Sequence, residues 1–329
     1  MKKYILSILI SVLFFNSCNR EKTRTSLLPN VTGKAGEVIL VMNTNLWESD
    51  FGDNFKKLLS QEHISLPQSE PIFNLVQIPQ NAFSDIFKLH RNIIYTTISN
   101  NIKKPEIFIK KDVWAKPQLY IKMVAPDNES FKKLFEENNE RILANIIKIE
   151  RERIITNYKK YEEKSLRNLL TKYHNISLCF PKGYRLRTDT TNFTWISHET
   201  PDISQGIFIY YYDYTDTNTF TLDYLLSKRD SFLQMYVPGP SESSFMTTEH
   251  LFNTSFKEFK FNEQYTVELR GLWKLKGDYM GGPFVSFSTV DEKRNRIITV
   301  EGYVYAPMFD KRNYIRQVEG ILYTFKIID

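Results

Sequence analysis

The sequence predicts an α+β protein made of two α/β domains with mainly antiparallel sheets, joined by a long helical segment. One indication is the length, because 329 residues exceed what a single hydrophobic core usually spans. Another is the composition, since 42% hydrophobic and 14% aromatic residues are enough for folded cores. The third is the order of the patterns, with a long helical rhythm between two regions that are rich in strands.

The first eighteen residues have the pattern of a lipoprotein signal peptide. Two lysines precede an apolar run, Tyr4 to Phe15, which would form about 18 Å of helix, too short for a hydrocarbon core of about 30 Å. The run ends in Ser17-Cys18, which resembles a bacterial lipobox. We therefore expect residues 1–18 to be the signal peptide and Cys18 to be lipidated. The alternative is a plain signal peptide with an incidental cysteine.

The remaining residues divide into four segments. Residues 19–30 are polar and have no periodicity, as is typical of a tether. Residues 31–125 are the predicted N-terminal α/β domain, and residues 126–174 are the long helical segment. An uninterrupted helix of that length would be longer than one domain, so we expect a break near Asn157 or Ser165. Residues 175–329 are the predicted C-terminal α+β domain.

The N-terminal domain combines strands with short helices. Helices are expected around residues 47–59 and 82–90, and apolar runs predict strands at residues 38–42, 73–78, 93–98, 106–111 and 118–124. In the helical segment, the charged run Glu150 to Arg153 is interpreted as a solvated face, and a coiled-coil partner is the lesser alternative.

Helices in the C-terminal domain are predicted at residues 222–236 and 310–322, with antiparallel strands between them. One strand places four aromatic rings on one face because its side chains alternate with period two: Phe208, Tyr210, Tyr212 and Tyr214. These rings could stack on sugars or peptides. Packing under a helix is the favoured interpretation.

Several functional classes are disfavoured by composition. A net charge of +6 is mild for this length, and export makes a nucleic-acid partner implausible. The five histidines are far apart and lack metal-ligand spacing, so no metal is expected, and no cofactor motif occurs. With Cys18 lipidated, Cys179 has no disulfide partner, and its apolar surroundings predict a buried, inert thiol.

Three groups of residues are candidates for a ligand or partner surface. His90, Arg91 and Asn92 form the most polar compact cluster of the N-terminal domain. Gly281 and Gly282 lie between two strands, in either a tight turn or a ligand loop. The third group consists of cations in the first two turns of the last helix, Lys311, Arg312 and Arg316.

Cations at a helix N-terminus oppose the helix dipole. This cost suggests that Lys311, Arg312 and Arg316 meet an anionic group, on a partner, on a lipid headgroup or on Glu301. Surface salt bridges are the favoured interpretation.

Several of these segments resemble a Bacteroidota lipoprotein family of unknown function: Leu66-Pro67-Gln68 with Glu70-Pro71, His90 to Ile93, Met280 to Phe284, and Lys311-Arg312 with Tyr314 and Arg316. The second half, from Phe180-Pro181 to Thr324-Phe325, is similar in layout to the PsbP-like fold. These resemblances imply a location and an architecture, and they imply no activity.

The sequence thus predicts a lipid-anchored protein of the bacterial cell envelope, at the outer membrane facing the periplasm. Its expected role is a non-catalytic binding or scaffold module for a partner protein or an envelope component such as glycan. The alternative is a hydrolase or transferase acting on envelope glycan or peptide, in which His90 or Glu301 would be acid or base. No catalytic residue is assigned and no cofactor is expected.

Overall fold

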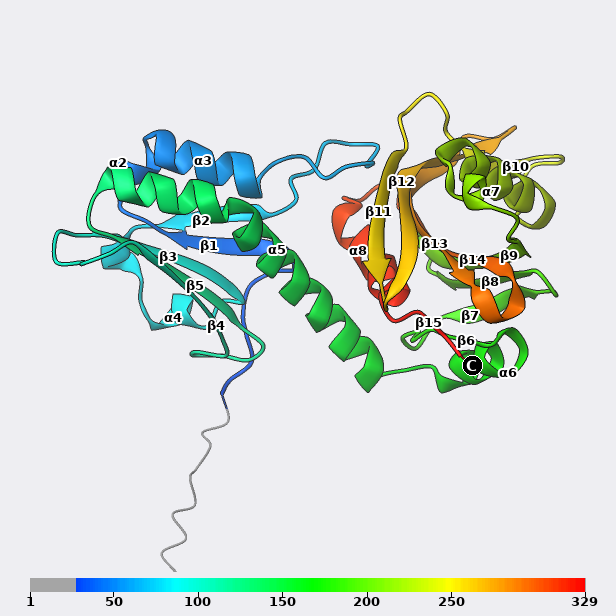
Figure 1. Cartoon of the computed structure of the whole chain (residues 1–329), viewed down its shortest axis with the longest axis horizontal. Helices are drawn as coiled ribbons and strands as arrows, with labels where there is room; N and C mark the ends of the chain where they lie inside the picture. Colours follow the sequence, from blue (N-terminus) through cyan, green and yellow to red (C-terminus); the bar gives the residue numbers. More distant parts are fainter. Residues whose placement is uncertain (1–27, 329) are drawn as a thin grey trace, which may run out of the picture.

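A computed structural model describes residues 28–328, so the predicted signal peptide, Cys18 and most of the tether lie outside the described residues. Within that range the α+β class, with mainly antiparallel pairing over the chain as a whole, is confirmed. Figure 1 shows two sheets with their own helices, and the long helix α5 leads from one to the other.

The N-terminal sheet has five strands in the order β2-β1-β3-β5-β4. They are β1 (Glu37–Val41), β2 (Asn74–Ile78), β3 (Asn92–Ile98), β4 (Glu106–Lys111) and β5 (Leu119–Ala125). This sheet is the exception to the antiparallel expectation, because β1 pairs in parallel with β2 and β3, and β3 with β5. Only β4 and β5 pair antiparallel. Parallel neighbours require crossover connections, which helical segments provide after β1 and after β2, and which the strand β4 provides between β3 and β5.

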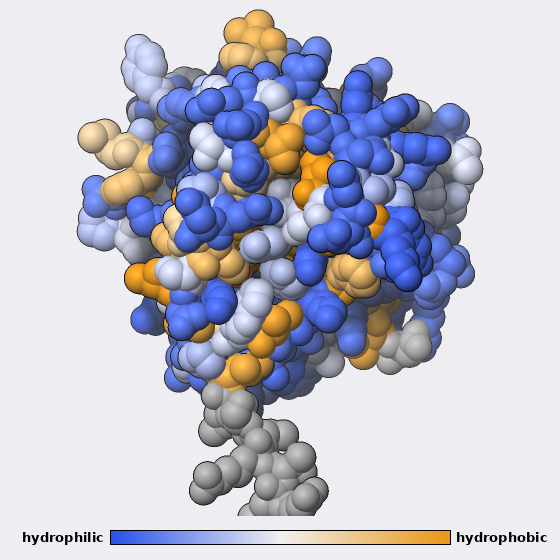
Figure 2. All heavy atoms as spheres, turned by 90° about the vertical axis from the view of Figure 1, so that its left-hand side faces the viewer, coloured by the Kyte–Doolittle hydropathy of each residue, from blue (hydrophilic) through white to orange (hydrophobic). Residues whose placement is uncertain are grey.

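Helices cover both faces of this sheet. One face is covered by α2 (Thr44–Trp47), α3 (Asp50–Leu59) and the first half of α5 (Asn128–Lys160), and Phe55 packs edge-on against Phe135 there at 4.6 Å. The other face packs against residues around η1 (Gln80–Ala82) and α4 (Asp85–Lys88). On the outer side of this half of the molecule, hydrophilic side chains dominate and hydrophobic ones form small separate groups (Figure 2).

The C-terminal sheet has eight strands, all in antiparallel pairs, in the order β10-β12-β13-β14-β9-β8-β7, with β11 beside β12. The strands are β7 (Arg185–Asp189), β8 (Phe193–Glu199), β9 (Ser204–Asp213), β10 (Phe245–Thr248), β11 (Ser255–Phe261), β12 (Gln264–Lys276), β13 (Gly281–Asp291) and β14 (Arg296–Tyr305). Short β6 (Ile176–Ser177) and β15 (Lys326–Ile327) pair separately, and two 3-10 turns are η2 (Thr217–Phe220) and η3 (Glu292–Arg294).

Two helices enclose this sheet, α7 (Leu222–Tyr236) on one face and α8 (Arg312–Leu322) on the other. Under α7, the ring of Tyr210 stacks on Phe232 with centroids 4.9 Å apart. Phe208 stacks on Tyr303 of β14 at 4.7 Å. The aromatic row of β9 is therefore core packing beneath a helix, as the favoured interpretation predicted.

The long helical segment is interrupted between the two predicted positions, because α5 ends at Lys160 and α6 (Lys164–His174) follows. The second half of α5 packs against α8, where the Tyr158 hydroxyl donates to the carbonyl of Gln317 at 3.2 Å. The charged face of α5 is not solvated as predicted. Glu150 is only 5% exposed and binds Arg153 of α5 and Arg91, the residue before β3, because this part of the helix packs against the N-terminal sheet.

The N-terminus of α8 is capped by a carboxylate from the other half of the chain. Glu70 accepts hydrogen bonds from the backbone N–H groups of Lys311, at 2.6 Å, and Arg312, at 2.9 Å. The anion expected near these cations is thus Glu70 of the same protein. Surface salt bridges are the wrong interpretation, because Lys311 and Arg312 are 3% and 6% exposed. A buried carboxylate at this position satisfies free amides and complements the helix dipole.

We expect Glu70→Ala to lower the free energy of unfolding by about 1–3 kcal/mol, because two buried amides lose a charged acceptor. Glu62→Ala is the matched control, since Glu62 lies in the same loop, is exposed, and accepts only from Ser69. Urea denaturation and hydrogen exchange of the Lys311 and Arg312 amides would measure the effect. Equal midpoints and equal exchange in both variants would contradict the capping role.

Candidate functional site

The polar cluster of the N-terminal half lies where α5 packs against the start of β3. Arg91 binds Glu150 through two hydrogen bonds of 2.9 Å. Asn92 donates to the same carboxylate at 2.7 Å, and Arg153 donates to the side-chain oxygen of Asn92 at 2.9 Å. These contacts hold α5 against the beginning of β3.

His90 lies behind this cluster and is 7% exposed. Its Nδ1 is 3.1 Å from the carbonyl oxygen of Asn92, and its Nε2 is 3.5 Å from a carboxylate oxygen of Glu37. Burial lowers the pKa of His90, which outweighs the opposite effects of the Asn92 carbonyl and of Glu37. The His90 imidazole is therefore buried beside the start of β1, where its contacts are structural.

The arginines of α8 also bind the N-terminal half. Arg312 donates to the carbonyl of Pro71 at 2.6 Å, and Arg316 donates to the carbonyl of Ile72 at 2.6 Å. Both guanidinium groups lie close to Gly36, where an added Cβ would be 3.0 to 3.1 Å from their nitrogens. Thus Arg91, Asn92, Arg312 and Arg316 converge on one junction, although sequence reasoning treated them as separate candidates.

Glu301 lies elsewhere, on β14 beneath α7. Its carboxylate makes a two-pronged ion pair with Arg229, with N–O distances of 2.8 and 2.9 Å, and both residues are 0% exposed. The remaining Arg229 nitrogen donates to Thr248, and its guanidinium stacks over the Phe284 ring at 3.8 Å. Glu301 is therefore neither the partner of the α8 cations nor placed together with His90.

The other candidate residues line an open groove of about 470 Å³. Gly281, Gly282 and Lys311 lie along it, together with Pro67 and Gln68 from the loop that also provides Glu70. The Lys311 ammonium donates to the side chain of Gln68 at 2.7 Å. The two glycines belong to the start of β13 rather than to the turn itself.

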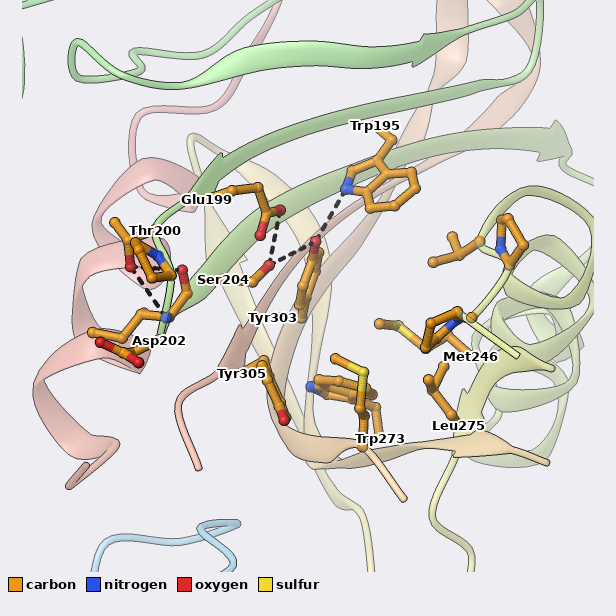
Figure 3. Close-up of a pocket in the computed structure, with 17 residues that line it drawn as sticks. Trp195, Glu199, Thr200, Asp202, Ser204, Met246, Trp273, Leu275, Tyr303 and Tyr305 are labelled. Carbon is orange, nitrogen blue, oxygen red and sulfur yellow. Dashed lines mark hydrogen bonds between the residues drawn. The ribbon is translucent and has the colours of Figure 1, made fainter. Parts of the chain in front are cut away.

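Beside this groove, the structure contains an aromatic cavity of about 300 Å³ that the sequence did not predict as a site (Figure 3). Four rings line it: Trp195, Trp273, Tyr303 and Tyr305. Met246 and Leu275 line the apolar end near α7, whereas Glu199, Asp202 and Ser204 lie at the opposite end (Figure 3). Trp273 and Tyr305 also line the groove, so the two hollows adjoin.

Hydrogen bonds fix the tryptophan rings of this cavity. Trp195 donates through Nε1 to the Tyr303 hydroxyl at 3.1 Å, and Trp273 donates to the carbonyl of Val304 at 3.1 Å. Ser204 donates to Glu199 at 2.9 Å across the β8–β9 hairpin, where the two residues are register partners. With both indole donors satisfied within the chain, the cavity offers ring surfaces at its walls and carboxylate acceptors at its mouth.

Two glycines make room for these rings. A Cβ on Gly206 would lie 2.3 Å from the Tyr303 ring. A Cβ on Gly282 would lie 2.0 Å from the Val304 carbonyl that Trp273 binds, and 3.2 Å from the indole nitrogen. Gly282 is therefore needed for a close strand approach that positions a cavity wall.

Little in the sequence predicts this cavity. Trp195, Trp273 and Tyr303 belong to strands that are separate in sequence, and only their registers bring them to one end of the sheet. The Pro238-Gly239-Pro240 turn after α7 also lines the cavity.

The described residues also bear on the state of Cys179, on membrane-spanning helices and on metal sites. Cys179 is 7% exposed, and burial raises the pKa of its thiol to about 11, which confirms a buried and unreactive cysteine. No helix in residues 28–328 combines the length and apolar character required to cross a membrane. Over the same residues, acidic, histidine and cysteine side chains form no group of three that could hold a metal ion.

Comparisons with known proteins identify domains without an assigned role. Residues 31–159 match the model of a domain of unknown function, DUF8532, and residues 163–324 match that of another, DUF4837. No curated protein matches the chain.

Similarity to solved structures is slight. The Ran-binding protein Mog1p of Saccharomyces cerevisiae is 8% identical, with 47% of this chain and 91% of Mog1p covered and a TM-score of 0.32. A Bacteroides thetaiotaomicron protein is 11% identical, with 47% and 46% covered and a TM-score of 0.21. A STAR-related lipid transfer protein fragment from Xanthomonas axonopodis is 9% identical, with 44% and 96% covered and a TM-score of 0.22. All three scores are below 0.5 and give no basis for assigning a role.

We expect Glu301→Ala to lower the free energy of unfolding by about 3–5 kcal/mol, because it leaves the Arg229 charge buried without a partner. The double variant Arg229→Met with Glu301→Leu should recover much of that loss, since it removes both charges. Glu292→Ala, at an exposed site, is the control. Urea denaturation would measure these three together with the single variants Arg229→Met and Glu301→Leu. A double variant as unstable as the sum of these two single variants would contradict a paired, structural Glu301.

Proposed function

We propose that this protein is a lipid-anchored, non-catalytic binding module of the bacterial cell envelope, and that the aromatic cavity with its adjoining groove is its ligand site. The observation that supports binding is the cavity itself, four aromatic rings around an open space with carboxylates at one end. Cavities of this kind, mainly apolar with a few placed polar groups, are typical of ligand sites.

The chemistry of the cavity defines the class of ligand. Aromatic faces bind apolar, cationic or sugar groups by stacking, and Glu199 and Asp202 accept hydrogen bonds or attract positive charge. The lining contains no lysine or arginine. A peptide or glycan component of the envelope with an apolar body and a basic or hydrogen-bond-donating end fits this arrangement.

Anchoring is supported by the sequence. The basic and apolar leader followed by Ser17-Cys18 has the lipobox pattern, and a cysteine with several acyl chains would be held stably where one chain would be marginal. The polar residues after Cys18 would act as a tether, and the outer membrane facing the periplasm is the proposed location.

A hydrolase remains the second candidate because Ser204 donates to Glu199 at the cavity mouth, which pairs a hydroxyl with a possible base. The same contact is accounted for by hairpin register, since these residues face each other where β8 and β9 join. Ser204→Ala distinguishes a hydrolase from a binding module. A hydrolase should lose its activity in this variant, whereas a binding module should keep its ligand affinity and show no hydrolysis with or without Ser204.

For the anchor, Cys18→Ala should move the protein from the membrane fraction to the soluble fraction, since the lipid would have no attachment atom. Fractionation of cells followed by immunoblotting measures this, with Cys179→Ala as the control for a cysteine change. Unchanged membrane association of Cys18→Ala would contradict lipidation at this residue.

For the ligand site, Tyr305→Ala should weaken binding of the envelope ligand, because it removes a ring shared by the cavity and the groove. Two of the four tryptophans line the cavity, so quenching of intrinsic fluorescence by muropeptides, glycan fragments and basic peptides provides the readout. The expected loss is about 1–3 kcal/mol of binding free energy, near that of one stacking ring.

Tyr173→Ala is the matched control, since Tyr173 is 63% exposed on α6 and lies outside the cavity lining. Crosslinking and pull-down from the native envelope, compared between the two variants, then identifies the partner. Equal binding by Tyr305→Ala and Tyr173→Ala would exclude the aromatic cavity as the site.

A further inference from the structure

A second cleft, of about 390 Å³, opens between the two halves of the molecule where α5 leaves the N-terminal sheet. Arg91, Arg153 and Asn157 line it from one side. Lys182, His198 and Gln317 line it from the other. It is separate from the aromatic cavity, with which it shares no lining residue.

Positive charge exceeds negative charge in this cleft. Its lining contains two arginines and a lysine but no aspartate or glutamate. The two arginines share one carboxylate, that of Glu150, which lies behind them. The ammonium of Lys182 makes no ion pair within 4 Å among residues 28–328.

The neighbouring arginines indicate the same shortage of anions. Nη1 of Arg316 on α8 is buried and has no hydrogen-bond partner among the described residues. Burial and then the nearby Arg312 charge lower the pKa of Arg316 to about 10. Burial, partly offset by Glu150, lowers the pKa of Arg153 to about 10 as well. Cations that lower one another's pKa are stabilised by an added anion.

The hydrogen-bonding groups left free in the cleft are mainly donors. Gln205 donates to the side-chain oxygen of Gln317 at 3.0 Å, which leaves the Gln317 amide nitrogen free. Arg91 uses Nε and Nη2 on Glu150 and retains Nη1. The Asn157 amide and the Lys182 ammonium add further donors.

We propose that this cleft binds a small multivalent oxyanion, a phosphoryl or polycarboxylate compound, between the N-terminal and C-terminal halves. Oxyanions are recognised by arginine and lysine donors in this kind of arrangement. The cleft volume suits a compact organic anion rather than a polymer. Because its walls come from both halves, the bound anion would connect α5 to the loop after Pro181 and reduce their relative motion.

Isothermal titration of the full chain in detergent, with pyrophosphate in metal-free buffer, tests the proposal. Lys182→Gln should raise the Kd by about two- to fivefold, the range for a partly exposed ion pair, and Lys182→Glu should raise it further. Lys182 is exposed, so neither change should disturb folding, and Lys182→Arg should keep the affinity. Lys104→Glu, at an exposed lysine of the N-terminal half, is the control for net charge.

Hydrogen exchange provides an independent readout. Pyrophosphate should protect residues 154–158 and 182–184 in the wild type and in Lys104→Glu, but less in Lys182→Glu. No pyrophosphate binding at millimolar concentration would overturn the proposal, as would equal Kd values for Lys182→Glu and Lys104→Glu. Binding to vesicles containing phosphatidylglycerol without binding to pyrophosphate would also overturn it, because the ligand would then be a membrane headgroup.

Discussion

The arrangement of the two halves depends on one constraint, that charges buried at their junction must be satisfied by groups from the opposite half. Glu70 provides the clearest case, because its carboxylate caps a helix whose first residue, Arg312, lies 242 positions later in the chain. Arg312 and Arg316 of α8 give further cases, because they donate to the carbonyls of Pro71 and Ile72 in the N-terminal half. Such a junction favours one relative position of the two halves, since any other docking would leave a buried charge without a partner in a medium of low polarity.

The same loop that provides Glu70 also provides Pro67 and Gln68 to the groove beside the aromatic cavity. Docking of the two halves therefore completes one side of the groove. The aromatic cavity lies wholly in the C-terminal half and is formed by strand ends and the turn after α7. The molecule thus separates satisfied polar residues, which fix its shape, from ring surfaces and carboxylates that remain available to solvent.

The local sequence pattern predicted most of the helices and strands, but it did not predict which of them pair or pack together. The apolar runs at residues 73–78 and 93–98 predicted β2 and β3, because strand-length apolar runs have a local signature. Their parallel pairing with β1 was missed, since no local feature records which strand lies next to which. Glu150 was misread for the same reason, because its partners Arg91 and Asn92 lie about 60 residues away in the sequence.

The tertiary contacts of the candidate site residues were likewise not predictable from the local sequence. The α8 cations were interpreted through the helix dipole, but their side chains bind the Gln68 side chain and the carbonyls of Pro71 and Ile72. The carboxylate at this helix end, Glu70, binds the backbone amides instead, which only tertiary structure shows. The aromatic cavity lacked a motif, because its rings come from three strands and meet through register.

The first strand after α6, β6, pairs with β15, which is the last strand of the described residues. The C-terminal core also needs α8, which begins at Arg312. The N-terminal core can therefore close once residues up to the first half of α5 are present, whereas the second core must wait for α8. Removal of α8 and β15 would leave the C-terminal core open to proteolysis while the N-terminal core keeps all its residues.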